Sequence, residues 1–240
     1  MPQPEDVTLD APLVATNNNS GPEGIYRFSG GYKVAIARAG NNPHSKSAGA
    51  GMTASIWDPY VEGQQHSACR LKIQKGADVL QVGWRVDPTL YGDIKPRLFI
   101  HFETFEGLSH RGDEASWEDT MSIGQDLVNG NWWFYMGHDD IPIGFWPKSM
   151  FTSLASLAAI VEWGGVVYSP PGVPEPPMGA SYPLVGDTSF DAYCETIDVD
   201  TTITHVDSPD LYQVKALPLY RRGKSQHFVL YGGPGEKEKA

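Results

Sequence analysis

Hydrophobic and polar residues alternate over short stretches of this chain, and Gly, Pro, Asn or Asp separates most of these stretches. Alternation with a period of two predicts β-strands. The predicted strands are 25–28, 32–38, 51–57, 67–74, 78–87, 97–105, 119–127, 131–136, 141–145, 160–168, 183–186, 193–206, 211–216 and 226–231. Asn129-Gly130 predicts a hairpin between two of them. Short strands at this spacing predict an all-β fold, an antiparallel, jelly-roll-like β-sandwich.

One short helix is predicted at Ser149–Ala159, where a Ser in the N-cap position opens the segment. Residues 170–177 are rich in Pro and predict a stiff loop outside the sheet interior. We expect an extended N-terminal arm over 1–29, one domain over 30–235 and a charged tail over 236–240. No internal repeat is visible.

The stretch 79–87 contains one unusual polar residue, Gln81, just before a Gly-Trp pair. Successive side chains of a strand point to opposite faces, so Trp84 is expected in a core and Gln81 with Arg85 on the other face. Arg85 has two possible roles, pairing with a nearby acid or holding a substrate carbonyl group.

The next strand, 97–105, repeats this division and places His101 and Glu103 among aromatic residues. Such a face fits a binding cleft, and it also fits an ordinary exposed face. For Trp132, Trp133 and Trp146, core and sheet-face packing is favoured over contact with a ligand.

The formal net charge of −11 argues against nucleic acid as a partner, because phosphate contacts need clustered Lys and Arg. No apolar run is long enough to span a membrane. The first residues lack the features of a signal peptide, so a cytoplasmic protein or a mature secreted form is expected. The two cysteines, Cys69 and Cys194, are compatible with one disulfide or with two free thiols.

Several catalytic motifs are absent from the sequence. There is no Gly-x-Ser-x-Gly nucleophile motif, no Cys-x-x-Cys spacing and no His-Glu-x-x-His zinc motif. His138-Asp139-Asp140 is interpreted as a polar hairpin tip rather than a metal site, and no cofactor is expected. Carboxylate chemistry remains by elimination, with Glu103 and Glu162 as the strand acids.

Several ordered motifs resemble the neprosin family of glutamic, proline-cleaving endopeptidases. They include Gly83-Trp84 followed by Leu90-Tyr91-Gly92-Asp93, then Asn131-Trp132-Trp133, Gly144-Phe145-Trp146-Pro147, Trp163-Gly164-Gly165 and Tyr231-Gly232-Gly233-Pro234-Gly235. The resemblance covers about residues 30–235. It implies an antiparallel β-sandwich whose concave cleft binds a proline-containing peptide at acidic pH.

The resemblance also implies two catalytic glutamates, one two residues before the Gly-Trp pair and one directly after Trp-Gly-Gly. In this sequence these positions hold Gln81 and Val166. An amide can still position a water or donate to an oxyanion, whereas Val can neither accept nor exchange a proton. Glu162 is a candidate replacement, but four residues of strand separate it from Val166 by roughly 13 Å. A bulge at Gly164-Gly165 would shorten that offset.

The sequence therefore predicts a neprosin-like endopeptidase that acts on proline-containing peptides at acidic pH by activating water at a Gln/Glu-type site. The altered positions Gln81 and Val166 leave its catalytic activity open. Candidate catalytic residues are Gln81, Glu162 and Glu103. Candidate substrate-binding residues are Trp84, Arg85, Tyr91, His101, Trp132, Trp133, Trp146 and Val166. The alternative is a catalytically silent protein of this fold that binds peptide, glycan or a cell surface, like a lectin or a toxin. The oligomeric state is left open.

Overall fold

The computed structural model of the chain describes residues 31–39, 46–104, 107–114, 118–197, 205–207, 211–221 and 224–236. The predicted arm 1–29, the predicted strand 25–28 and residues 237–240 of the charged tail lie outside these ranges. No helix in the described ranges is long and apolar enough to cross a membrane.

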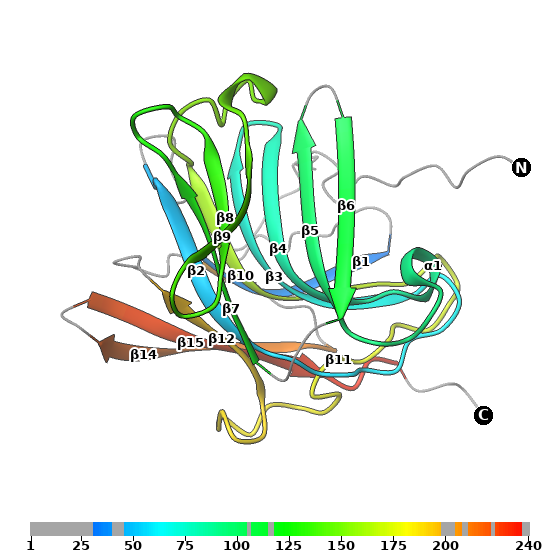
Figure 1. Cartoon of the computed structure of the whole chain (residues 1–240). Helices are drawn as coiled ribbons and strands as arrows, with labels where there is room; N and C mark the ends of the chain where they lie inside the picture. The colour runs from blue at the N-terminus through cyan, green and yellow to red at the C-terminus, as the bar shows by residue number, and fades with distance from the viewer. Residues whose placement is uncertain are drawn as a thin grey trace, which may run out of the picture.

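Fifteen strands and two short helical segments make up the described part of the chain (Figure 1). The strands are β1 (Tyr32–Ala39), β2 (Gly49–Ser55), β3 (His66–Lys75), β4 (Asp78–Val86), β5 (Arg97–Thr104), β6 (Gly107–Glu114), β7 (Glu118–Gln125), β8 (Trp132–Met136), β9 (Ile141–Trp146), β10 (Ile160–Tyr168), β11 (Met178–Gly179), β12 (Ala192–Ile197), β13 (His205–Asp207), β14 (Gln213–Arg221) and β15 (Lys224–Gly233). The helical segments are α1 (Pro88–Tyr91) and the 3₁₀ turn η1 (Lys148–Met150).

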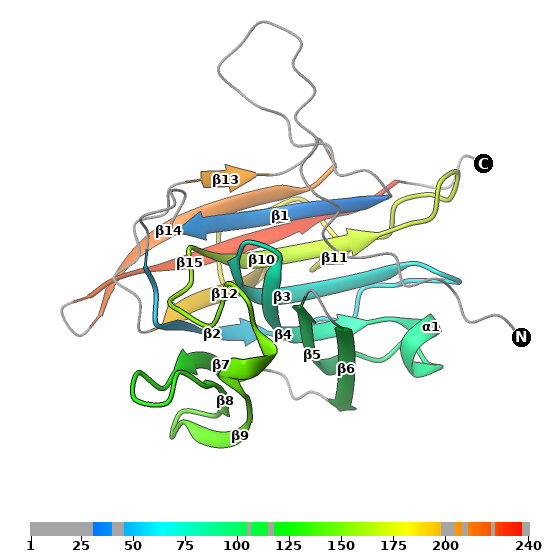
Figure 2. The same ribbon diagram turned by 90° about the horizontal axis from the view of Figure 1, so that it is seen from above.

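The described strands form two antiparallel sheets, which confirms the predicted β-sandwich. The first sheet has the order β13-β1-β10-β3-β4-β5-β6, and the second has the order β11-β15-β12-β2-β7-β8-β9 with β14 beside β15. Seen from above, the first sheet lies over the second (Figure 2). Strands from distant parts of the chain are neighbours within each sheet, so many strand contacts are long-range.

The hydrophobic core lies between the two sheets and contains Leu80, Val82, Trp84 and Val86 of β4. Trp84 Nε1 donates a hydrogen bond of 2.9 Å to the backbone oxygen of Ser55 in the second sheet. This arrangement confirms the predicted faces of β4, since Gln81 and Arg85 project to the opposite side. We call that side, which is turned away from the second sheet, the outer face of the first sheet.

The helix predicted over Ser149–Ala159 is wrong, because only the turn η1 forms there. The buried carboxylate of Asp78 accepts hydrogen bonds from the backbone N–H groups of Ser153 and Leu154, the latter at 2.9 Å. Trp132 Nε1 donates to Leu154 O at 2.7 Å. These contacts direct the backbone groups to distant strands, so they cannot close successive helical turns.

The α-helix of the described chain is α1 instead. The Asp87 side chain caps it by accepting from the N–H groups of Thr89 and Leu90, and Pro88 occupies its first turn. Sequence reasoning extended a strand through Asp87 and missed this capped turn.

Three other strand predictions need correction. Residues 183–186 form a loop, because the backbone N–H groups of Val185 and Gly186 bond to the carboxylate of Asp191. The predicted strand 193–206 corresponds to β12 and β13, which belong to different sheets. Strand β6 was not predicted. In contrast, the hairpin at Asn129-Gly130 and the polar tip at residues 138–140 are confirmed between β7, β8 and β9.

Candidate functional site

Two glycines shape the outer face of the first sheet where the family motifs meet. A Cβ atom on Gly83 would lie 1.9 Å from the backbone oxygen of Cys69, and one on Gly164 would lie 2.2 Å from that of Ala35. No side chain fits at either point. The strands therefore come close together here, and the Gly-Trp and Trp-Gly-Gly motifs provide the two positions that allow it.

Arg70 of β3 lies between these two glycines, because its register partners are Gly164 on one side and Gly83 on the other. Its guanidinium group is buried and reaches along the outer face. Nη1 donates to Gln81 Oε1 at 2.8 Å, and Nη2 lies 3.3 Å from Glu162 Oε2. One cation therefore links Gln81 and Glu162, two of the three residues that the sequence suggested for catalysis.

Gln81 is completely buried, with Lys72 and His101 as its register neighbours on the outer face. Its carbonyl oxygen accepts from Arg70, while its Nε2 has no hydrogen-bond partner among the described residues. The amide at the expected catalytic position is thus fixed in orientation, with its donor side still available.

Glu162 of β10 is surrounded by three cations. Its Oε1 accepts a hydrogen bond of 2.6 Å from Arg38 Nε, and its Oε2 lies 3.8 Å from Lys72 Nζ in addition to the contact with Arg70. Burial alone would raise the pKa of this carboxyl group, but Lys72, Arg70 and Arg38 lower it to about 2. The carboxylate is therefore ionised at pH values well above 2 and is a weak base.

The stability of the fold is expected to depend on pH through this group. A carboxyl pKa near 4.5 in the unfolded chain and about 2 in the folded protein contributes about 3 kcal/mol. That contribution is present above pH 4.5 and is lost as the pH falls through 2. Urea unfolding at successive pH values should show it as a difference from Glu162→Gln that shrinks between pH 4.5 and 2. A constant difference over this range would contradict the assignment.

Val166 lies on the same face of β10 as Glu162 but in an apolar environment. It forms a small buried cluster with Tyr32, Val34 and Ile36 of β1. The register of β10 with both neighbouring strands runs without a shift through Gly164-Gly165, so the bulge considered from sequence is absent. Glu162 consequently stays four residues from Val166 along the strand.

A second polar group lies on the outer face near this cluster, where the ring centres of His66 and Tyr32 are 5.5 Å apart. Arg85 Nη2 is 2.6 Å from Asp87 Oδ2 and 3.0 Å from His66 Nδ1, and the guanidinium carbon lies 5.3 Å from the centre of the Phe99 ring. The predicted pairing of Arg85 with a nearby acid is confirmed for Asp87. Burial, followed by the charge of Arg85, holds the pKa of His66 well below its ordinary value. The neutral imidazole can therefore accept from Arg85 through Nδ1.

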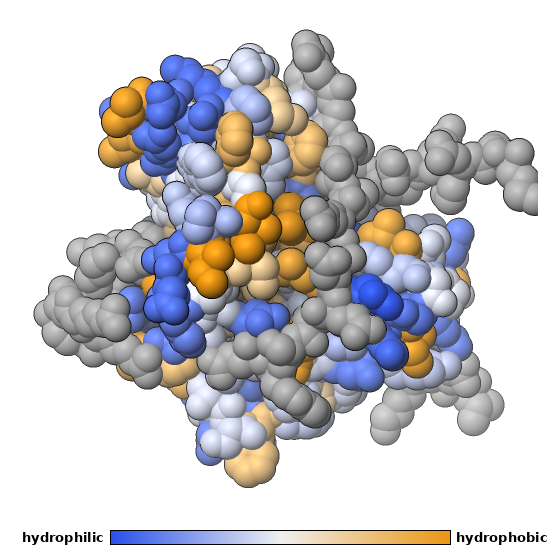
Figure 3. Space-filling view, in the orientation of Figure 1, coloured by the Kyte–Doolittle hydropathy of each residue, from blue (hydrophilic) through white to orange (hydrophobic). Residues whose placement is uncertain are grey.

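The remaining candidate residues lie in several environments. Trp84, Trp132 and Trp146 are buried in the core between the sheets. On the second sheet, the rings of Trp133 and Phe145 are tilted by 31° and their centres lie 4.9 Å apart. Apolar side chains gather near the centre of Figure 3, and Phe145 of β9 is 50% exposed.

Three further candidate site residues lie in β5 and α1: His101 and Glu103 in β5, and Tyr91 in α1. His101 is buried and stacked on Phe99 at 5.9 Å. Glu103 follows on the same face of β5 and is half-buried. Tyr91 lies in α1, with its ring centre 5.7 Å from the Arg97 guanidinium carbon.

Sequence reasoning missed Arg38, His66, Arg70 and Lys72. A signal was present in β3, where His66, Arg70 and Lys72 alternate with the apolar side chains of the core. Across the described residues, no group of three or more His, Cys, Asp or Glu side chains is arranged to hold a metal ion.

Comparison with protein-family models agrees with the motifs. The family model described as Neprosin matches residues 63–107 and 103–234. Among solved structures, a Scytalido-glutamic peptidase with a peptide-based transition state analog has 11% sequence identity and a TM-score of 0.44. That alignment covers 85% of this chain and 98% of the other. SCP-B, a member of the Eqolisin family of peptidases in complex with the tripeptide Ala-Ile-His, has 10% identity and the same coverages and TM-score.

Proposed function

The chain belongs to the neprosin family, and from this premise we propose that it binds proline-containing peptides without hydrolysing them. The observation that carries the proposal is the state of three residues on the outer face: Gln81, Glu162 and Val166. Peptide hydrolysis by carboxyl groups needs one of them to accept a proton from water and another to stabilise the oxyanion. Here one expected position is an amide and the other is apolar.

Glu162 is a poor substitute for the missing base. A carboxylate held at a pKa of about 2 by three cations has little tendency to take a proton from water near pH 5. Both of its oxygens already have partners, Arg38 at Oε1 and Arg70 with Lys72 at Oε2. The group acts as the counterion of the cluster rather than as a catalyst.

The outer face nevertheless offers hydrogen-bond donors to a ligand. Arg70 Nε, Gln81 Nε2 and Arg85 Nε are buried and have no hydrogen-bond partner among the described residues. Peptide carbonyl oxygens are suitable acceptors, and a Pro residue offers its carbonyl without an N–H donor of its own. Because all three side chains are buried, a ligand must displace the groups that cover them, and we expect slow association.

An active endopeptidase is the second candidate function, with Gln81 and either Glu162 or Glu103 at its centre. The link through Arg70 favours it, since one guanidinium group brings Gln81 and Glu162 together. The low pKa of Glu162 counts against it. The two candidates differ in a measurable way, because only one predicts turnover.

Peptide cleavage provides the first test. We expect the wild-type protein to leave a proline-containing peptide intact between pH 3 and 7, as followed by mass spectrometry. The double variant Gln81→Glu/Val166→Glu should show cleavage if the fold accepts the two carboxyl groups, and circular dichroism checks that it is folded. Cleavage by the wild type would overturn the proposal that the protein binds peptides without hydrolysing them, and it would support an active endopeptidase.

Ligand binding provides the second test. Isothermal titration calorimetry with the same peptide should show binding to the wild type and an affinity about tenfold weaker for Gln81→Met. This substitution keeps the side-chain length but removes the Nε2 hydrogen-bond donor. Gln74→Met is a matched control. Gln74 lies in β3 of the same sheet, but its Nε2 donates a hydrogen bond to Gly76 O near the protein surface. A peptide with Ala in place of Pro tests the proline preference, and a panel of glycans tests the alternative ligand class. Equal affinities in both Met variants would exclude this face as the binding site.

A further inference from the structure

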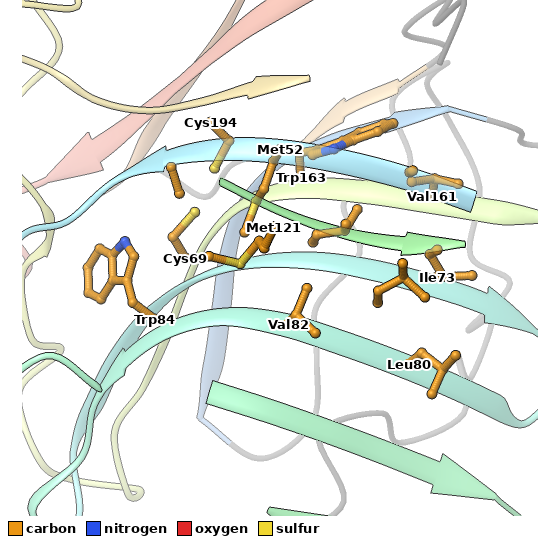
Figure 4. Packing of buried hydrophobic residues seen from close by; sticks show 14 of the residues in the cluster. Met52, Cys69, Ile73, Leu80, Val82, Trp84, Met121, Val161, Trp163 and Cys194 are labelled. Atoms are coloured by element: carbon orange, nitrogen blue, oxygen red, sulfur yellow. The ribbon is translucent and has the colours of Figure 1, made fainter. Parts of the chain in front are cut away.

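Cys69 of β3 and Cys194 of β12 face one another across the core. Both are completely buried, and the structure contains them as free thiols. Figure 4 shows their sulfur atoms directed toward one another between the two sheets. The two residues enclose more than half of the chain between them, so a bond between them would join distant segments.

The two sheets come close together at this point. Cys69 is the register partner of Trp84, and Cys194 is the register partner of Ala54. The Trp84 indole crosses the core to bond with Ser55, the residue after Ala54.

A second indole forms a similar bridge on the other side of the pair, where Trp163 Nε1 donates to Gly51 O at 3.1 Å. Gly165, the other register partner of Cys69, has no room for a side chain, because a Cβ atom would lie 2.4 Å from Met178 Sδ. The close approach of the sheets is therefore fixed by bonds and packing that do not involve the thiols.

We propose that Cys69 and Cys194 form a disulfide that joins the two sheets when the protein folds under oxidising conditions. This inference is independent of the proposed function. In the presence of glutathione disulfide, one cysteine thiolate attacks a glutathione sulfur and releases one glutathione. The second thiolate then attacks the protein sulfur of the mixed disulfide and releases the other glutathione, which takes up the second proton.

The folded protein protects the thiols from this reaction. Burial, together with the neighbouring Cys69, raises the pKa of the Cys194 thiol well above its ordinary value. A buried, protonated thiol reacts slowly with oxidants. The bond is therefore expected to form during folding rather than in the finished fold, and the redox conditions of folding decide between the two states.

Refolding from denaturant in reduced and oxidised glutathione, compared with refolding in reductant, tests the proposal. After oxidative refolding, thiol titration in denaturant should find no free thiol, and a digest should contain the peptide of Cys69 joined to that of Cys194. The melting temperature should rise by roughly 10 °C, because a bond that closes so long a loop restricts the unfolded chain strongly.

Cys194→Ala is the control and should show no rise in melting temperature under either condition. Reduction of the oxidised wild type should return its melting temperature to the reduced value. Free thiols, glutathione adducts on both cysteines or a lower melting temperature after oxidative refolding would each overturn the proposal.

Discussion

Replacing Glu162 by Gln is expected to lower the free energy of unfolding by about 3–5 kcal/mol, the usual cost of removing one partner from a buried ion pair. The carboxylate is the shared anion of Arg38, Arg70 and Lys72, and all four side chains are largely buried. Gln has the same shape but no charge. The three cations would then repel one another without the anion that holds them together.

Urea unfolding at pH 7 measures this effect directly, and the melting temperature should fall by roughly 10 °C. Asp139→Asn is a suitable control, because it also removes one negative charge but lies exposed at the β8–β9 turn. It should change stability by no more than about 0.5 kcal/mol. Equal unfolding midpoints for Glu162→Gln and the wild type would show that the cluster does not depend on its anion.

Gly83→Ala is expected to destabilise the protein by at least about 3 kcal/mol and to reduce the yield of folded protein sharply. The added methyl group would lie 1.9 Å from Cys69 O and 2.9 Å from the Cα atom of Arg70. Both are backbone positions of the neighbouring strand, so the strands themselves must separate. The contact between Arg70 and Gln81 would be disturbed by the same movement.

Gly144→Ala is the matched control, because it lies in strand β9 and an added Cβ atom there meets nothing within 4 Å. Its melting temperature and yield should be close to those of the wild type. Gly164→Ala should resemble Gly83→Ala, since its Cβ atom would lie 2.2 Å from Ala35 O. Normal stability of Gly83→Ala would mean that the close approach of these strands is not required by the fold.

Much of the sandwich could be predicted because strand alternation is a local property. The faces of β4 follow from the sequence of that strand alone, and the structure confirms them for Trp84 and Gln81. The prediction of a helix at Ser149–Ala159 failed for the opposite reason. The contacts that decide this segment come from Asp78 and Trp132, which are distant in the sequence.

The electrostatic cluster of the site could not be predicted in the same way. Arg38, Arg70, Lys72 and Glu162 come from β1, β3 and β10, and they meet only because these strands are neighbours in the first sheet. The register that places Arg70 opposite both Gly83 and Gly164 is set by the pairing of β3 with β4 and β10, and the sequence of a single strand does not determine it. The environment of Glu162, and with it the low pKa, follows from that register.

By itself, the sequence determined the strand pattern, the family motifs and the identities of the residues at the two expected catalytic positions, Gln81 and Val166. These features are fixed by residue type and local order along the chain. Only the tertiary structure decided that the ionised Glu162 pairs with three cations, that Arg70 donates a hydrogen bond to Gln81 and that Cys69 faces Cys194. Each of these depends on side chains from strands that are distant in sequence, and their contacts exist only once the sheets have formed and packed.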